Sequence, residues 1–186
     1  MKTLLIGLAM IVYGCRSDNK DGNSFTFKTT KGEDRLVSPS ESRKGVVYVF
    51  LVPDCPFSQF YTMSVNQVYS FYKAKGYDFY GIVPGKLYSK AEIDSFKSAY
   101  SFIPEILIDE NYKFSRSLDV SVVPQVVLTD KNGAVLYSGK IDDQAIRPGE
   151  KKYKATEFYL LNALKEYDSG KPVSIKKTEP VGCFIE

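Results

Sequence analysis

The residues best suited to chemistry are a cysteine and a serine three positions apart, between a hydrophobic run and a helix-like segment. Cys55 follows the run at 45–52 and directly precedes Pro56, and Ser58 stands where a Cys-x-x-Cys redox motif has its second thiol. A thiol at a helix N-terminus faces unpaired N–H groups and the positive end of the dipole, which favour the thiolate. Asp54 opposes this, because a nearby carboxylate disfavours a second anion. The pattern indicates a reactive Cys55, with Ser58 as a candidate hydrogen-bond donor to its sulfur.

A second feature is Val123-Pro124, in a segment that otherwise has the composition of an interior strand. Proline has no N–H to donate to a neighbouring strand, so it is unusual at the start of such a segment. A cis peptide bond explains it and leaves a backbone edge on which a peptide pairs. A proline that merely begins a strand explains it equally well. Cys55 also has a plainer interpretation, as the small buried apolar residue that free cysteines often are.

The composition excludes several kinds of site. The 186 residues contain no histidine, which rules out Ser-His-Asp and Cys-His catalysis and any histidine-ligated zinc or copper site. The net charge is +3 with acids and bases mixed, so nucleic acid is not an expected partner. No G-x-x-x-x-G-K phosphate loop occurs, and no cofactor or metal is expected. Asp142 and Asp143 follow a predicted hairpin strand, where paired acids are more typical of turn capping than of catalysis.

The N-terminus has the features of an export signal. Lys2 precedes a short apolar run at 4–14, which is too short for a spanning helix of about 20 residues. The sequence Val-Tyr-Gly-Cys at 12–15 resembles a bacterial lipobox, which predicts a signal peptide at 1–14 and lipidation of Cys15. An ordinary signal peptide followed by a chance cysteine is the alternative.

Lipidation at Cys15 predicts the organisation of the remaining chain. The polar segment at 15–23 is typical of a flexible tether, and 24–186 forms the expected folded domain. The expected location is the bacterial cell envelope, lipid-anchored to the membrane, periplasmic or at the outer membrane. This context permits disulfides. Two cysteines remain, Cys55 and Cys183, and an even remainder in an exported protein favours pairing.

The elements that position these residues alternate between strand and helix. Strands are predicted at 24–30, 45–52, 77–83, 105–109 and 121–130, the last joined by a turn at 130–133 to a hairpin partner. Helices are predicted at 58–76, 89–100 and 155–170, with a short one within 111–120. The alternation at 24–30 predicts an edge strand, and the continuous apolar run at 45–52 predicts a central strand buried on both faces. The order predicts a single α/β domain with an antiparallel edge.

Helix ends and faces follow from local patterns. Ser89 and Glu92 form a capping box, and Thr156 is the predicted cap of the last helix. Apolar residues recur at roughly helical spacing within 58–76, namely Phe60, Met63, Val65, Val68, Phe71 and Tyr72. The aromatic residues at helical spacing are expected in the core rather than around a cofactor, namely Tyr69, Phe71, Tyr72 and Tyr159.

These motifs, in this order, resemble the thioredoxin fold, and the second half narrows the resemblance to peroxiredoxin-like redoxin-domain proteins. The resemblance is carried by Asp-Cys-Pro at 54–56, Val-Pro at 123–124, Tyr-x-Gly-x-Ile-Asp-Asp at 137–143 and Gly-Cys-x-Ile at 182–185. It covers about residues 24 to 186. It implies a thioredoxin-like three-layer sandwich with a mixed central sheet and a C-terminal tail.

The same resemblance implies roles for particular residues in thiol–disulfide or peroxide chemistry. Cys55 corresponds to the attacking thiol, Pro124 to the cis-proline and Cys183 to a resolving partner. The absence of a second thiol at Ser58 counts against simple Cys-x-x-Cys cycling. The implied partners are protein thiols and disulfides or peroxide, with the membrane reached through the lipid anchor.

Two departures count against efficient peroxidase activity. Peroxiredoxins have a threonine three residues before the attacking cysteine and a proline seven residues before it, where this chain has Val52 and Tyr48. They also need an arginine beside the thiolate, for which Arg116 and Arg147 are candidates.

The sequence leaves two functions in competition. One is a membrane-anchored thiol–disulfide oxidoreductase or peroxiredoxin-like enzyme that uses Cys55 and Cys183. The other is a non-enzymatic lipoprotein that binds a partner at the Val123-Pro124 edge, with a structural disulfide or none. Copper delivery, as in the similarly folded Sco proteins, needs clustered cysteines and a histidine that this chain lacks. The Cα separation of Cys55 and Cys183 is decisive for pairing, because a bridge needs less than about 7 Å.

Overall fold

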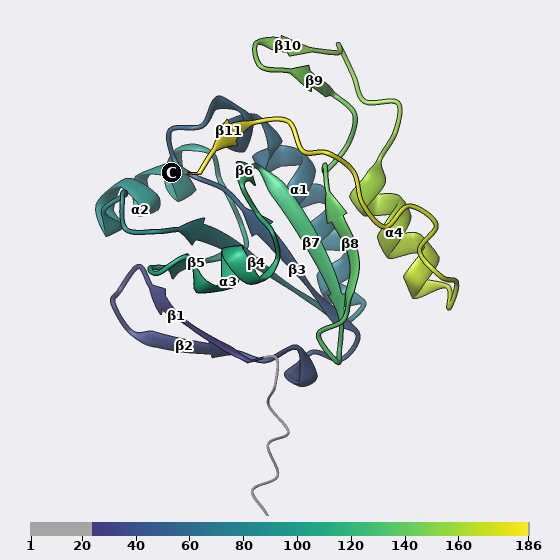
Figure 1. Ribbon diagram of the computed structural model, residues 1–186, viewed down its shortest axis with the longest axis horizontal. Coiled ribbons are helices and arrows are strands. Elements are labelled where there is room, and N and C mark those ends of the chain that lie inside the picture. Colours follow the sequence, from purple (N-terminus) through teal and green to yellow (C-terminus); the bar gives the residue numbers. More distant parts are fainter. Residues whose placement is uncertain (1–23, 186) are drawn as a thin grey trace, which may run out of the picture.

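Seven strands form one mixed sheet in the computed structural model, which describes residues 24–185 (Figure 1). The predicted signal peptide at 1–14, Cys15 and the tether at 15–23 lie outside the described residues. The order across the sheet is β2-β1-β5-β4-β3-β7-β8. The strands are β1 (Phe25–Thr29), β2 (Asp34–Val37), β3 (Gly45–Phe50), β4 (Tyr77–Pro84), β5 (Glu105–Asp109), β7 (Gln125–Asp130) and β8 (Val135–Gly139). The strands β3, β4 and β5 run parallel, and the remaining pairs are antiparallel, as the sequence predicts for a mixed sheet.

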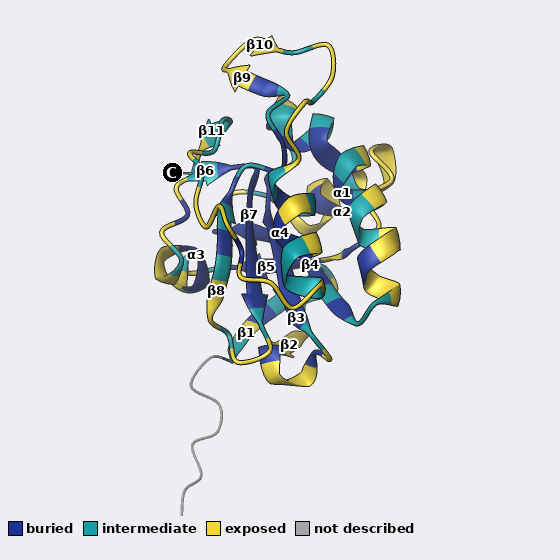
Figure 2. Ribbon diagram, turned by 90° about the vertical axis from the view of Figure 1, so that its right-hand side faces the viewer, coloured by how far each residue is buried: buried dark blue, intermediate teal, exposed yellow. Residues whose placement is uncertain are grey.

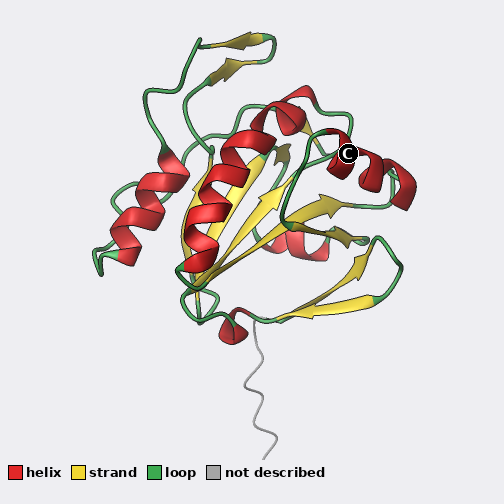
Figure 3. Cartoon of the chain, turned by 180° about the vertical axis from the view of Figure 1, so that it is seen from behind, coloured by secondary structure: helices red, strands yellow, loops and turns green. Residues whose placement is uncertain are grey.

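Helices cover both faces of this sheet and make the three layers (Figures 1 and 3). The helices are α1 (Pro56–Ala74), α2 (Lys90–Ala99), α3 (Lys113–Ser117) and α4 (Tyr159–Asp168), with a single 3-10 turn η1 (Pro39–Glu41). Buried residues of α1, α2 and α4 share one hydrophobic cluster, whereas Phe114 of α3 belongs to a second cluster on the other face. Within residues 24–185, no helix is long and apolar enough to cross a membrane.

The central strand β3 is buried along its whole length, which confirms the prediction from its unbroken apolar run (Figure 2). Side chains alternate across a strand. Val47 and Val49 therefore face the cluster under α1, whereas Tyr48 and Phe50 face the cluster around Phe114. Because both faces are anchored, the end of β3 that leads to Cys55 is held rigidly in place.

Two predictions about the sheet are corrected. Strand β1 is not an edge strand, because β2 pairs with it on one side and β5 on the other. The edge strand β2 was not predicted, since its sequence Asp-Arg-Leu-Val is polar and mostly exposed. The segment predicted as one strand at 121–130 is divided at Pro124 into β6 (Val122–Val123) and β7, and β6 lies outside the seven-stranded sheet.

Two predictions about helices are also wrong in detail. Phe71, which was expected in the core, lies on the outer face of α1 and is 59% exposed, and Met63 of the same helical spacing is 70% exposed. Thr156 does not cap α4, which begins after Phe158. The amide and hydroxyl of Thr156 instead donate hydrogen bonds to Asp143. The donors of Thr156 are therefore bonded to a carboxylate that is distant in sequence, and not to the start of α4, where the local pattern placed them.

Asp142 and Asp143 organise a turn, which agrees with the interpretation favoured from the sequence. Tyr61 donates to Asp142 over 2.8 Å, and burial raises the pKa of Asp142. Burial alone would also raise the pKa of Asp143, but hydrogen bonds from Glu157, Lys152 and Thr156 outweigh it and hold that pKa well below its ordinary value. The two pKa values shift in opposite directions because the two carboxylates are attached to different parts of the fold. Asp142 is buried against Tyr61 of α1, whereas Asp143 is bonded to the segment at 152–157. These attachments fix the base of a projecting hairpin made of β9 (Ala145–Arg147) and β10 (Glu150–Lys151).

Candidate active site

Cys55 occupies the turn between β3 and α1, where the sequence predicts it. It is the N-cap of α1, and Pro56 is the first residue of the helix. Its N–H donates to the carbonyl of Val52, and its own carbonyl accepts from the amide of Gln59. Proline is well placed here, because the N–H that it lacks would have no partner within the helix. The side chain of Cys55 therefore lies at the positive end of α1, and Cys55 is only 2% exposed.

The partner of Cys55 is Cys183, which is 128 residues away in sequence. The two residues form a disulfide with a Cα separation of 6.1 Å. This value lies within the limit of about 7 Å for a bridge. The structure therefore brings together the two cysteines that the even count and the family resemblance had suggested.

The C-terminal tail (residues 171–185) carries Cys183 to this position. Its last part forms β11 (Cys183–Phe184), which pairs antiparallel with β6, with Cys183 opposite Val123 and Phe184 opposite Val122. Figure 1 shows this short strand, in yellow, beside β6. The residues of the tail show no local preference for a strand, because the pairing depends on β6 and on the disulfide.

The Val123-Pro124 peptide bond is cis, which confirms the first of the two interpretations of this dipeptide. The carbonyl oxygen of Val123 lies 3.4 Å from Cys55 Sγ. Pro124 thus ends β6 directly beside the cysteine pair. The edge that a partner peptide was expected to use is occupied by the protein's own tail.

Ser58 is buried at the start of α1, but its contact differs from the prediction. Its hydroxyl oxygen accepts a hydrogen bond from the amide of Val52 over 3.2 Å. Within the described chain it makes no hydrogen bond to Cys55. Ser58 therefore fixes the strand-to-helix turn that precedes the cysteine, and a role toward the thiol stays a prediction.

A cavity of about 400 Å³ opens beside the disulfide. The lining residues come from the three connections β3–α1, β4–α2 and β5–α3 and from the tail, and they are Val52, Asp54, Cys55, Pro84, Leu87, Tyr88, Tyr112, Cys183, Phe184 and Ile185. The hydroxyl of Tyr88 donates to the carboxylate of Asp54. Sequence patterns did not single out Tyr88 or Tyr112, because nothing local marks a loop tyrosine as a neighbour of a distant cysteine.

The two arginines considered from the sequence differ in their relation to this cavity. The guanidinium of Arg116 lies over the ring of Tyr112, a residue of the cavity wall, 5.4 Å from its centroid. Arg147 belongs to β9 and pairs with Glu150 of the projecting hairpin. Neither arginine is a lining residue, and the position of the peroxiredoxin threonine is filled by the apolar Val52.

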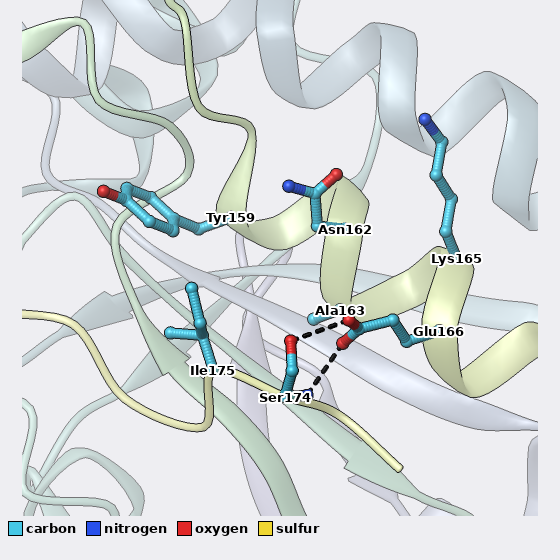
Figure 4. A pocket seen from close by; sticks show the side chains of 7 residues that line it. All are labelled: Tyr159, Asn162, Ala163, Lys165, Glu166, Ser174 and Ile175. Carbon is cyan, nitrogen blue, oxygen red and sulfur yellow. Dashed lines mark hydrogen bonds between the residues drawn. The ribbon is translucent and has the colours of Figure 1, made fainter. Parts of the chain in front are cut away.

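A second hollow of about 240 Å³ lies against α4, away from both cysteines (Figure 4). The amide and hydroxyl of Ser174 donate to the carboxylate of Glu166, and this holds the pKa of Glu166 below its ordinary value. The contact joins the start of the tail to α4. It fixes the start of the tail, and the residues that line this hollow include no cysteine.

Thr178 is the last firm attachment of the tail before Cys183. Its amide donates to the carbonyl of Ser138 over 3.1 Å, and its hydroxyl oxygen accepts from the amide of Lys140 over 2.8 Å. The hydroxyl groups of Thr178 and Tyr137 are also hydrogen-bonded. These contacts fix the tail to β8 and leave residues 179–185 to cross to β6.

Known structures with a similar fold include two that align with nearly the whole chain and others that align with about 60% of it. A hypothetical protein from Sinorhizobium meliloti 1021 is 20% identical with a TM-score of 0.76, covering 87% of this chain and 90% of that one. An uncharacterized conserved protein from Geobacillus kaustophilus is 22% identical with a TM-score of 0.77, covering 88% of each chain. A secreted disulfide oxidoreductase from Mycobacterium tuberculosis, homologous to E. coli DsbE, is 24% identical with a TM-score of 0.50, covering 60% of this chain and 79% of its own. At these identities the likenesses show the thioredoxin-like fold.

Comparison with curated proteins gave no significant match. The model of the redoxin family matches residues 18–155, which include Cys55 and Pro124 but end before the tail. The redoxin match and the cysteine pair support a redox function in general terms. Because the match extends over more than half of the sequence, this chain belongs to the redoxin family.

Proposed function

We propose that this chain is a thiol–disulfide oxidoreductase in which Cys55 attacks and Cys183 resolves. The observation that carries the proposal is the disulfide between Cys55, at the start of α1, and Cys183, on a tail paired beside cis-Pro124. Membership of the redoxin family supports the same chemistry. A disulfide oxidoreductase with a similar fold, the secreted one from Mycobacterium tuberculosis, is consistent with it.

The exchange proceeds in two steps that conserve atoms and electrons. The Cys55 thiolate attacks one sulfur of a substrate disulfide, forming a mixed disulfide and releasing the other substrate sulfur as a thiolate. The Cys183 thiolate then attacks Cys55 Sγ, forming the intramolecular bond and releasing the second substrate thiolate. The substrate has gained two electrons and the chain has lost them. An external dithiol restores the reduced chain, and the reverse sequence oxidises a substrate.

Disulfide substrates are favoured over peroxide at this site. The cavity wall at Val52 offers no hydroxyl to hold a peroxide, and neither Arg116 nor Arg147 lines the cavity. A backbone edge beside the cysteine is suited instead to an extended polypeptide. We assign protein disulfides and thiols as the substrate class.

The proposal extends to the location of the protein. The lipobox-like sequence at 12–15 supports cleavage after a signal peptide at 1–14 and lipidation of Cys15. Residues 15–23 then serve as a tether, and 24–186 as the redoxin domain in the bacterial cell envelope. A thiol–disulfide oxidoreductase suits this compartment, because disulfides persist outside the reducing cytoplasm.

Glutathione disulfide tests the assignment of the two cysteines. In a full chain carrying Cys15→Ser, reduced protein is expected to form the Cys55–Cys183 bond without a lasting adduct. With Cys183→Ser added, a glutathione adduct should accumulate on Cys55, because nothing resolves it. Alkylation of the remaining thiols followed by peptide mass spectrometry identifies the adduct. If Cys55 stays unmodified in that variant, it is not the attacking thiol and the proposal is wrong.

A further inference from the structure

The pairing of β11 with β6 shows how a peptide is held at the cysteine. Strand β6 lies outside the main sheet, and β11 is its partner. The amide of Ile185 extends the pairing by donating to the carbonyl of Ser121 over 3.0 Å. Hydrogen bonds of this kind involve only the main chain, so an extended peptide of another protein can make them equally well. The register places the peptide's cysteine opposite Val123, within bonding distance of Cys55.

Once the disulfide is broken, the tail after Thr178 is held by a few main-chain hydrogen bonds and by the packing of two partly buried side chains, Val181 and Ile185. Within the described chain, hydrogen bonds after Thr178 are confined to the pairing with β6 and Ser121. The side chain of Phe184 is 80% exposed. A short tether gives the tail an effective concentration on the order of millimolar, which a partner must overcome. The tail is therefore a competitor that another peptide is able to replace.

Gly182 meets a strict requirement of the groove along β6, by which we mean the backbone edge at residues 121–123 that β11 and Ile185 occupy. A Cβ atom at this position would lie 1.9 Å from the carbonyl oxygen of Val123 and 2.6 Å from its carbonyl carbon. Both atoms belong to the backbone beside cis-Pro124, so neither is able to turn aside as a flexible side chain would. The groove accepts glycine before the cysteine, and a larger residue there forces the two backbones apart.

The position after the cysteine is less restricted. Phe184 and Ile185 line the cavity, together with Leu87 and Tyr88. The cavity is open, and Phe184 remains mostly exposed within it. Apolar or aromatic residues fit this wall, but the contact is too loose to exclude others.

We propose that residues 179–185 act as an internal stand-in for substrate. In the reduced protein, the groove along β6 then takes an extended peptide whose cysteine directly follows a glycine. This inference rests on the proposed function, because the bound peptide is the disulfide that Cys55 attacks. It adds a substrate class: exported proteins with an exposed Gly-Cys pair in an extended segment. It also explains why the tail has glycine at 182, where the structure allows no other residue without displacement.

Two matched peptides test this selectivity. One carries the tail sequence Glu-Pro-Val-Gly-Cys-Phe-Ile, and the other has alanine in place of its glycine; each cysteine is activated as a mixed disulfide with thionitrobenzoate. The reduced full chain with Cys15→Ser and Cys183→Ser offers Cys55 as its one cysteine. Cys55 Sγ bonds to the peptide sulfur, and thionitrobenzoate leaves as a coloured thiolate that reports the rate. The glycine peptide should react about tenfold faster or more, which corresponds to about 1.4 kcal/mol in the barrier.

Two controls separate the possible failures. The first control is the small disulfide dithiobis(nitrobenzoate), which carries no peptide. The rate at which it releases thionitrobenzoate therefore measures the reactivity of Cys55 itself. If Cys55 ignores this reagent, the proposed function fails and the inference with it. If Cys55 reacts with it but attacks both peptides at equal rates, the groove has no glycine requirement and only the inference is overturned.

Adding Gly182→Ala to the chain should displace its own tail and speed attack on the glycine peptide several-fold. An unchanged rate would show that the tail does not occupy the groove.

Discussion

Replacing Cys55 with serine is expected to lower the rate of disulfide exchange with a protein substrate by roughly a thousandfold or more. A serine hydroxyl is neither ionised at neutral pH nor able to form a bond to sulfur that exchanges reversibly. No other thiol lies at the start of α1, since Ser58 occupies the second position of the motif. Turnover is measured as reduction of insulin disulfides with a thiol reductant present.

Replacing Cys183 with serine should give a different defect. The first attack by Cys55 persists, and without added thiol the reaction stops at a mixed disulfide with the substrate. Cys15→Ser is the matched control, because it removes the remaining cysteine, which has no part in the proposed exchange. Equal losses in all three variants would mean that the exchange does not proceed through Cys55, and the assignment would fail.

Reduction of the Cys55–Cys183 bond is expected to lower the free energy of unfolding by about 2–4 kcal/mol while leaving the fold intact. The bond closes a loop of 128 residues, for which chain entropy alone predicts a loss of about 5 kcal/mol. Part of this loss is offset, because reduction frees residues 179–185 in the folded protein as well. Of these residues only Val181 packs against the core beneath α1 and α4, and it does so from a partly buried position, so the rest of that core stays in place.

Guanidinium unfolding with and without dithiothreitol measures this loss. The variant Cys183→Ser in non-reducing buffer is the control, since it lacks the bond without any reductant and should match the reduced native chain. A reduced protein that is unfolded in the absence of denaturant would contradict the account. In that case the disulfide would be indispensable for the fold, and an enzyme that loses it in every cycle would not work.

The parts of the fold that could be predicted are those with strong local signals. The apolar run of β3 predicts burial on both faces, and Ser89 and Glu92 form the capping box that the sequence predicts, with the Ser89 hydroxyl accepting from the Glu92 amide. Asp-Cys-Pro predicts a strand-to-helix turn, and α1 does begin at Pro56. In each case the physical cause lies within a few residues of the feature.

The predictions that failed depend on partners distant in sequence. Nothing near Thr156 indicates that Asp143 will accept its hydrogen bonds. Strand β1 has the alternation of an edge strand, but β2 pairs with its free side. The helical spacing of Met63 and Phe71 does not reveal that α1 leaves this side uncovered.

The features of the candidate site also divide into those with a local signal and those that depend on partners distant in sequence. Local patterns indicate Cys55 and Pro124, and the even cysteine count favours Cys183. For the Val123-Pro124 bond they leave a cis bond and a proline that merely begins a strand as equal alternatives. The pairing of β11 with β6 and the close approach of Gly182 to Val123 are tertiary features with no local signal. Tyr88 and Tyr112 likewise line the cavity only because separate loops meet there.

The redox equilibrium of the Cys55–Cys183 pair tests the central claim most directly. The chain with Cys15→Ser is equilibrated in buffers of defined glutathione or dithiothreitol ratio, free thiols are trapped by alkylation, and the oxidised fraction is measured by mass spectrometry. Because the hydrogen bonds of residues 179–185 are confined to β6 and Ser121, we expect reversible titration with a midpoint between about −300 and −120 mV, the range of exchanging redox pairs. A pair that stays oxidised to well below about −300 mV behaves as a structural disulfide, and that result would contradict an oxidoreductase.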